Sequence, residues 1–193
     1  MISGLLQLES FQSENKHTQK ILRNTQLRIQ TMATVHEMFY QSSSFNNLRF
    51  ENFVENMVEA IQAILTNQTN QITFEFDVEP LELNINQAVP CGLILNELIT
   101  NAYKHAYPES GGEVEVSIET EGKKVTMGVE DNGIGLLERI SIDEPMTLGF
   151  TLIKNLSKQL NAKILLDRQL GTNVSVQFTK EDKKGAGSSM GIS

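Results

Sequence analysis

Apolar positions in the first third of the chain recur at intervals of three and four residues, as they do along one face of an α-helix. This spacing predicts a long helix over residues 16–42 and a second helix over residues 50–65, with a polar, serine- and asparagine-rich break between them. Residues 2–11 show a similar helical pattern of apolar and polar residues and are expected to form the end of an earlier helix. The gap before Lys16 is polar and short, which favours an antiparallel hairpin. We therefore expect a helical region over residues 1–66.

Beyond residue 67 apolar and polar residues alternate, which is typical of β-strands. The predicted strands lie around residues 72–76, 114–118, 125–129, 164–166 and 174–178. Two helices interrupt them, one from residue 86 or 87 to 107 and one over residues 149–160. This order predicts an α+β fold in which a mixed or antiparallel sheet carries helices on one face. The domain should span residues 67–180, and the Lys-, Gly- and Ser-rich residues 181–193 should form a disordered tail.

Composition narrows the classes of function. A net charge of −8 gives the chain no attraction for a polyanion, so we expect no nucleic-acid partner. No apolar run reaches the roughly 18 residues that a membrane-spanning helix requires, and no signal peptide is evident. The single cysteine, Cys91, leaves no intrachain disulfide and is expected to lie in the core. These features favour a cytoplasmic location.

The first of the two later helices carries a polar face. Glu97, Asn101 and His105 are spaced by four residues and share one side of the helix, with Lys104 beside them. An amide oxygen is a suitable ligand for a hard cation such as Mg²⁺. Lysine and histidine can donate to phosphate oxygens. The spacing is therefore suited to a metal-phosphate ligand, and a solvated polar face is the plainer alternative.

A second motif follows a predicted strand directly. In Glu130-Asp131-Asn132-Gly133-Ile134-Gly135, the aspartate can accept a hydrogen bond from an exocyclic amine such as that of adenine. Gly133 and Gly135 would let the backbone approach a ligand closely. An ordinary Asp-Asn-Gly turn is the alternative interpretation.

Two further positions belong to the same argument. Gly149 opens the second later helix and is followed by Thr151, and the free N–H groups and dipole at a helix start suit a phosphate. Thr172 lies in the turn before the last strand and could face the same ligand.

In this order and spacing, the four segments resemble the N, G1, G2 and G3 boxes of the histidine-kinase ATPase domain, the Bergerat-type ATP-binding fold. The resemblance covers about residues 71–179, and its specific parts are Leu95–His105 and Glu130–Gly135. It implies an α/β sandwich that binds ATP and Mg²⁺.

The resemblance also implies a role for each candidate residue. Asp131 would accept from the adenine amine, with Gly133 and Gly135 close to the ligand, and Asn101 would bind Mg²⁺. Lys104 and His105 would lie along the phosphates or ribose, and Glu97 would orient the attacking group or accept its proton. Residues 136–148 would form a lid. The remaining candidates for nucleotide contact are Gly149, Thr151 and Thr172.

The helical region resembles the HisKA_2 subgroup of sensor histidine kinases in Met1–Ser10, Gln26–Ile29 and Met32–Tyr40. In that subgroup the phosphorylated histidine lies some turns before the segment that here begins with Met1, so we expect it upstream. His36 lacks the basic residue and proline turn of other subgroups and is expected to have a structural role. The resemblance implies an ATP:protein-histidine phosphotransferase, a homodimer through a truncated helical hairpin, and a response-regulator receiver domain as partner.

Three alternatives remain from the sequence. A nucleotide-gated interaction module would bind ATP without transferring phosphate. An ATP hydrolase of the same fold, as in gyrase or mismatch-repair proteins, would require a large second domain, whereas only about a dozen residues follow here. A serine kinase of the anti-sigma type uses a related domain, and the helical hairpin argues against it.

Overall fold

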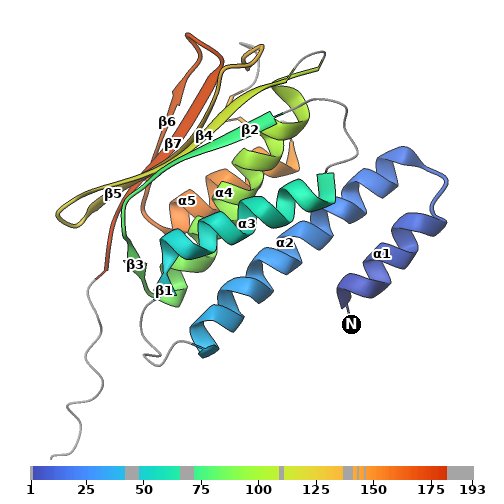
Figure 1. Cartoon of the computed structure of the whole chain (residues 1–193), viewed down its shortest axis with the longest axis horizontal. Helices are drawn as coiled ribbons and strands as arrows, with labels where there is room; N and C mark the ends of the chain where they lie inside the picture. The colour runs from blue at the N-terminus through green and yellow to red at the C-terminus, as the bar shows by residue number, and fades with distance from the viewer. Residues whose placement is uncertain are drawn as a thin grey trace, which may run out of the picture.

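The computed structural model shows a helical region followed by a sheet that carries helices on one face (Figure 1). It describes residues 2–41, 48–65, 72–108, 111–136, 141–142, 144–145 and 147–181. Residues 137–140, 143 and 146 of the predicted lid, and residues 182–193 of the predicted tail, lie outside these ranges. The domain boundaries at residues 66 and 180 stay predictions.

Three helices open the chain, and their bounds agree with the apolar periodicity. Helix α1 (Ile2–Gln12) and α2 (Lys16–Gln41) pack against each other as an antiparallel hairpin, and α3 (Phe50–Leu65) lies alongside α2 (Figure 1). The apolar stripe of α3 is buried, with Phe50 and Phe53 both fully enclosed. Within the described ranges no helix is long and apolar enough to cross a bilayer.

The main sheet has five strands in the order β2-β4-β5-β7-β6. They are β2 (Ile72–Val78), β4 (Gly112–Glu121), β5 (Lys124–Asp131), β6 (Lys163–Asp167) and β7 (Thr172–Thr179). Strand β2 pairs with β4 in parallel, and every other pairing is antiparallel. The sheet is therefore mixed, one of the two arrangements that the sequence left open.

A two-stranded ladder that the sequence did not predict joins the helical region to the segment that follows β2. Strand β1 (Leu48–Arg49) pairs with β3 (Glu82–Leu83), with Leu48 opposite Leu83. The backbone N–H of Phe50 also donates to the Leu81 carbonyl at 2.8 Å. The start of α3 is thus tied by backbone hydrogen bonds to the segment that leads into the next helix.

Helix α4 (Ile85–His105) lies between the sheet and the helices α2 and α3 (Figure 1). Asn84 caps its start, because the Asn84 side-chain oxygen accepts from the backbone N–H of Gln87 at 3.1 Å. Both sides of α4 are covered, and even polar residues in it are buried, among them Asn96 and Glu97. Helix α5 (Leu148–Gln159) packs beside it over β6. Buried polar side chains on α4 therefore face other elements rather than solvent.

Candidate nucleotide-binding site

A cleft of about 530 Å³ opens between α2, α4, the end of β5, the start of α5 and β7. It collects sequence-predicted residues from four separate segments. Those that line it are Glu97, Asn101, His105, Asp131, Gly135, Gly149 and Thr172. Apolar side chains such as Leu98, Val129 and Phe150 form much of the remaining wall. An apolar cleft with a few polar groups at fixed places is the usual form of a small-molecule site.

One end of the cleft is built around Asp131, the last residue of β5. Its side chain is buried, and its Oδ1 accepts from the backbone N–H of Gly133 at 3.0 Å. Burial raises the pKa of Asp131 above its ordinary value, although hydrogen bonds from Gly133 and Thr172 act to lower it. Asp131 is therefore a fixed acceptor in an apolar surrounding, as recognition of an exocyclic amine requires.

The glycine after this aspartate is required by packing. A Cβ at Gly133 would lie 2.4 Å from the carbonyl oxygen of Ala106, at the end of α4. The next N–H, that of Ile134, donates to the same carbonyl at 3.0 Å. Gly133 is not among the residues that line the cleft, whereas Gly135 is. Gly133 thus brings the loop against α4, and the ligand-facing backbone comes two residues later.

Tyr107, which the sequence analysis did not single out, anchors this loop. Its hydroxyl lies 2.7 Å from Asn132 Oδ1, contacts the Glu113 carbonyl, and accepts from the Asn132 backbone N–H at 3.1 Å. Asn132 Oδ1 also accepts from the Glu113 N–H at 3.1 Å. The network joins the end of α4, the start of β4 and the Asp131 loop, and so fixes Asp131 in place.

The opposite end of the cleft brings the start of α5 against the polar face of α4. A Cβ at Gly149 would lie 2.9 Å from Glu97 Oε2 and 3.8 Å from Asn101 Nδ2. Thr147 caps α5, its hydroxyl accepting from the backbone N–H of Phe150 at 3.4 Å. The absence of a side chain at Gly149 keeps the positive end of the α5 dipole open to an anion.

Two predicted residues point elsewhere. The Lys104 ammonium donates to Asn24 Oδ1 of α2 at 2.5 Å, and Lys104 is not among the residues that line the cleft. The Thr151 hydroxyl donates to the Thr147 carbonyl within the first turn of α5, at 2.9 Å, and Thr151 also lies outside the lining. His105 does line the cleft and is exposed.

Helix α2 supplies a side chain to the cleft that the sequence analysis missed. Arg28 forms a two-pronged ion pair with Glu97, from Nε to Oε1 at 2.6 Å and from Nη2 to Oε2 at 2.8 Å. The two side chains are only 15% and 8% exposed. The hydrogen bond to Glu97 is the largest influence on Arg28 and raises the pKa of its guanidinium. Because the partners are 69 residues apart, their spacing in the sequence gives no sign of this contact.

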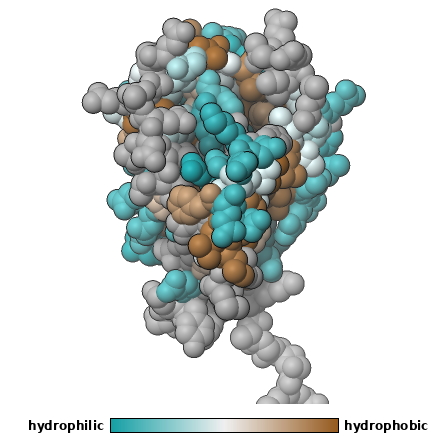
Figure 2. Space-filling view, turned by 90° about the vertical axis from the view of Figure 1, so that its right-hand side faces the viewer, coloured by the Kyte–Doolittle hydropathy of each residue, from teal (hydrophilic) through white to brown (hydrophobic). Residues whose placement is uncertain are grey.

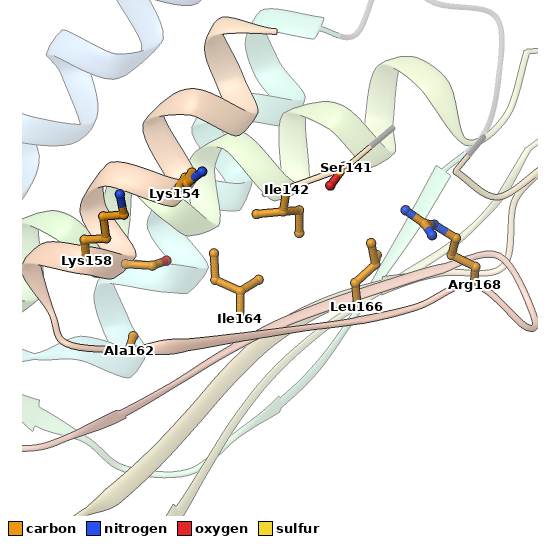
Figure 3. Close-up of a pocket in the computed structure, with 9 residues that line it drawn as sticks. Ser141, Ile142, Lys154, Lys158, Ala162, Ile164, Leu166 and Arg168 are labelled. Atoms are coloured by element: carbon orange, nitrogen blue, oxygen red, sulfur yellow. The ribbon is translucent and has the colours of Figure 1, made fainter. Parts of the chain in front are cut away.

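A second cavity, of about 430 Å³, lies between α5 and β6 (Figure 3). Three basic side chains surround an apolar floor. The lining residues are Ser141, Ile142, Lys154, Ser157, Lys158, Ala162, Ile164, Leu166 and Arg168. It contains none of the sequence-predicted site residues, so the cleft between α2, α4 and α5 remains the candidate nucleotide site.

Two protein-family models match this chain. Residues 1–65 match the HisKA_2 family, described as histidine kinase, and residues 86–183 match the HATPase_c family, described as histidine kinase-, DNA gyrase B-, and HSP90-like ATPase. The second match covers half of the chain, which therefore belongs to the family of histidine kinase-, DNA gyrase B- and HSP90-like ATPases. The two matches together place it among sensor histidine kinases of the HisKA_2 type.

Individual relatives are distant. The sensor histidine kinase PdtaS of Mycobacterium tuberculosis is 23% identical over 187 residues, which are 90% of this chain and 35% of that protein. The chain thus spans about a third of that curated relative. The histidine kinase domain of the Erythrobacter litoralis EL346 blue-light activated kinase is similar with a TM-score of 0.68 and 21% identity, covering 93% of this chain and 84% of that one. The Acinetobacter baumannii histidine kinase AdeS is similar with a TM-score of 0.59 and 18% identity, covering 93% of this chain and 95% of that one. These structures confirm the predicted Bergerat-type fold.

Proposed function

We propose that this chain is the ATP-binding kinase part of a sensor histidine kinase, which transfers the γ-phosphate of ATP to a histidine of the whole protein. The observation that carries the proposal is the cleft itself. It places a buried aspartate acceptor at one end and the open N-terminus of α5, beside Asn101, at the other. ATP has complementary groups at its two ends: the adenine amine donates a hydrogen bond, and the triphosphate is negatively charged.

Each end has a defined task in this proposal. Asp131 accepts from the adenine amine, and the apolar walls hold the ring. The α5 N-terminus and His105 lie along the phosphates. The Asn101 amide oxygen fits Mg²⁺, which keeps several waters and binds largely through substrate phosphates. The bound ion would screen the phosphate charge during transfer, and Glu97 would orient the attacking group or accept its proton.

The helical region is the proposed dimer surface. Large apolar side chains remain exposed on it, including Leu5, Leu8 and Phe11 of α1 and Ile21 and Met32 of α2. Figure 2, which views the molecule from the side where α1 lies in Figure 1, shows hydrophobic residues exposed between hydrophilic ones. Pairing with a second copy as a helical bundle would cover them. The phosphorylated histidine would then pass its phosphoryl group to an aspartate of a response-regulator receiver domain, in the cytoplasm.

One observation favours a second candidate function. Both carboxylate oxygens of Glu97 accept from Arg28, so the proposed catalytic group is occupied in this arrangement. A chain locked in this arrangement would be a nucleotide-gated interaction module, which binds ATP without transferring phosphate.

The binding site is tested by calorimetric titration with ATP and Mg²⁺. The variant Asp131→Asn should lose at least about tenfold in affinity, because a hydrogen bond to a charged group contributes about 1.5–3 kcal/mol. Asp167→Asn is a matched control. Asp167 also ends a strand and its Oδ1 also accepts from the N–H two residues on, at 3.0 Å, but it is exposed and outside the cleft. Equal loss in both variants, or no binding by the folded wild type, contradicts the site.

The transfer itself is tested on the full-length protein. Radiolabelled γ-phosphate should appear on histidine, as an acid-labile and base-stable label, only when Mg²⁺ is present. A full-length protein that binds ATP and never becomes labelled would favour the nucleotide-gated module instead.

A further inference from the structure

Arg28 lies at the end of the cleft formed by the first turn of α5 and the polar face of α4. It lines the cleft together with Glu97, Asn101 and Gly149. The Glu97 carboxylate that it holds lies 2.9 Å from the place of a Gly149 Cβ, so the guanidinium, the carboxylate and the first turn of α5 meet at one end of the cleft. The Asp131 loop instead contacts Ala106, nine residues after Glu97 along α4, so it lies at the other end of the cleft. An adenine bound at Asp131 would therefore direct its phosphate chain toward Arg28.

The ion pair in this structure uses both oxygens of Glu97. Nε and Nη2 of Arg28 donate to Oε1 and Oε2 at 2.6 and 2.8 Å. Both oxygens of a carboxylate held in this way are engaged by a fixed cation, which leaves fewer acceptor sites for an attacking group. Glu97 becomes fully available to an attacking group only when Arg28 has another partner.

A terminal phosphate is such a partner. A guanidinium binds phosphate oxygens with the same two-pronged geometry as a carboxylate, and a terminal phosphate carries more negative charge. Both side chains are mostly buried, at 15% and 8% exposed, so electrostatic attraction here is weakened little by water. Leaving Glu97 without a partner would be costly only until the attacking group or its proton reaches it.

We propose that Arg28 is a specificity-determining residue of the nucleotide site, which exchanges its bond to Glu97 for one to the terminal phosphate of ATP. The inference rests on the proposed function of the cleft. One exchange has two effects: it adds a ligand for the third phosphate, and it releases Glu97. ADP ends before this position and leaves the ion pair intact. Because Arg28 belongs to α2, the helical region detects whether the bound nucleotide has a third phosphate.

The test measures ATP and ADP affinities, both with Mg²⁺, for wild type and four variants of the whole chain. Wild type should bind ATP more tightly than ADP. Arg28→Gln should lower ATP affinity about tenfold and ADP affinity less than twofold, the size of one hydrogen-bonded contact to a charged group. Arg28→Lys keeps the charge and loses the two-pronged geometry, so its ATP affinity should lie between those of wild type and Arg28→Gln.

The decisive comparison measures the effect of Arg28→Gln in a chain that already carries Glu97→Gln. In Glu97→Gln the arginine loses its charged, two-pronged partner and keeps at most one hydrogen bond to the amide oxygen, so ATP affinity should rise several-fold while ADP affinity rises less. Adding Arg28→Gln to this variant should again lower ATP affinity about tenfold. The double variant contains no unpaired buried charge, so it also serves if Arg28→Gln alone does not fold.

Three outcomes overturn the inference. If the double variant binds ATP as tightly as Glu97→Gln, Arg28 acts only through Glu97 and does not contact phosphate. If ATP and ADP affinities fall by the same factor in both Arg28 variants, the residue supports the cleft as a whole. In either case the proposed function stands, because wild type still binds nucleotide. A folded wild-type chain that binds neither nucleotide removes the proposed function and this inference together.

Discussion

Gly171, in the turn before β7, offers a quantitative test of how the sheet end is built. Its φ is +87°, and a Cβ added to it would lie 1.8 Å from the carbonyl oxygen of Asp131 and 3.0 Å from the Asn132 Cα. Both neighbours are backbone and cannot move aside as a flexible side chain would. Gly171→Ala should therefore pay a backbone strain of about 1–2 kcal/mol for the positive φ, and about 2 kcal/mol more for the displaced strand end.

A control for the strain alone lies at the β4–β5 turn. Gly122 has a φ of +64°, and a Cβ there would meet nothing within 4 Å. Gly122→Ala should cost only the strain. In a chain of this size each kcal/mol shifts the melting temperature by about 2–4 °C. In thermal unfolding followed by circular dichroism, Gly171→Ala should thus melt about 4–8 °C below Gly122→Ala.

The two variants should also differ in nucleotide binding. Displacing the Asp131 carbonyl moves the residue that forms one end of the cleft, so folded Gly171→Ala should bind ATP more weakly, and Gly122→Ala should bind as wild type does. Equal melting temperatures for the two variants would refute the reasoning, because the sheet end would then relax without cost around an added methyl group.

Three further predictions follow from buried groups. Arg28→Ala should lower the free energy of unfolding in urea by about 3–5 kcal/mol, because Glu97 is left buried and unpaired. The side chain of Arg49 is 70% exposed in its own ion pair, so Arg49→Ala should cost less than about 1 kcal/mol. Similar costs for the two variants would contradict this. Burial holds the pKa of Asp131 above its ordinary value, so this carboxyl stabilises the fold below its ordinary pKa and that contribution is lost as the pH rises through the raised pKa. Asp131→Asn should melt above wild type at pH 7, with a difference that narrows towards pH 3; a constant difference would show another cause. Burial also raises the pKa of the Cys91 thiol, so a thiol reagent at pH 8 should label the chain only after denaturation, and rapid labelling of folded protein would show that Cys91 is accessible.

Local pattern was sufficient for the elements whose partners are near in sequence. The apolar spacing over residues 16–42 and 50–65 predicted α2 and α3 almost to their ends. The alternation on either side of Glu121-Gly122 predicted the β4–β5 hairpin, because its turn lies between the two strands. The ladder of β1 with β3 was missed, since two residues are too few to show a period.

The site residues that could be predicted are likewise those whose relation is set by local spacing, and those set by tertiary packing could not be predicted. Residues four apart on α4, such as Glu97 and Asn101, were expected to share a face, and both line the cleft. Lys104 is one residue before His105 and so points to a different side of the helix, where it meets Asn24. The role of Arg28 could not be predicted, because on α2 it has the spacing of an ordinary solvated charge. Its partner is set by how α2 packs against α4, which no local pattern encodes.

The parallel pairing of β2 with β4 has a consequence for the order in which the chain folds. Ile72 pairs with Gly112, forty residues away across α4, whereas Glu121 pairs with Lys124 across a turn. Closing the longer loop costs more chain entropy before any hydrogen bond forms. The β4–β5 hairpin should therefore form early in refolding, and β2 should join the edge of the sheet late. In pulsed hydrogen exchange, amides of β5 should become protected before those of β2, so that this edge strand of the sheet is among the last parts to become ordered.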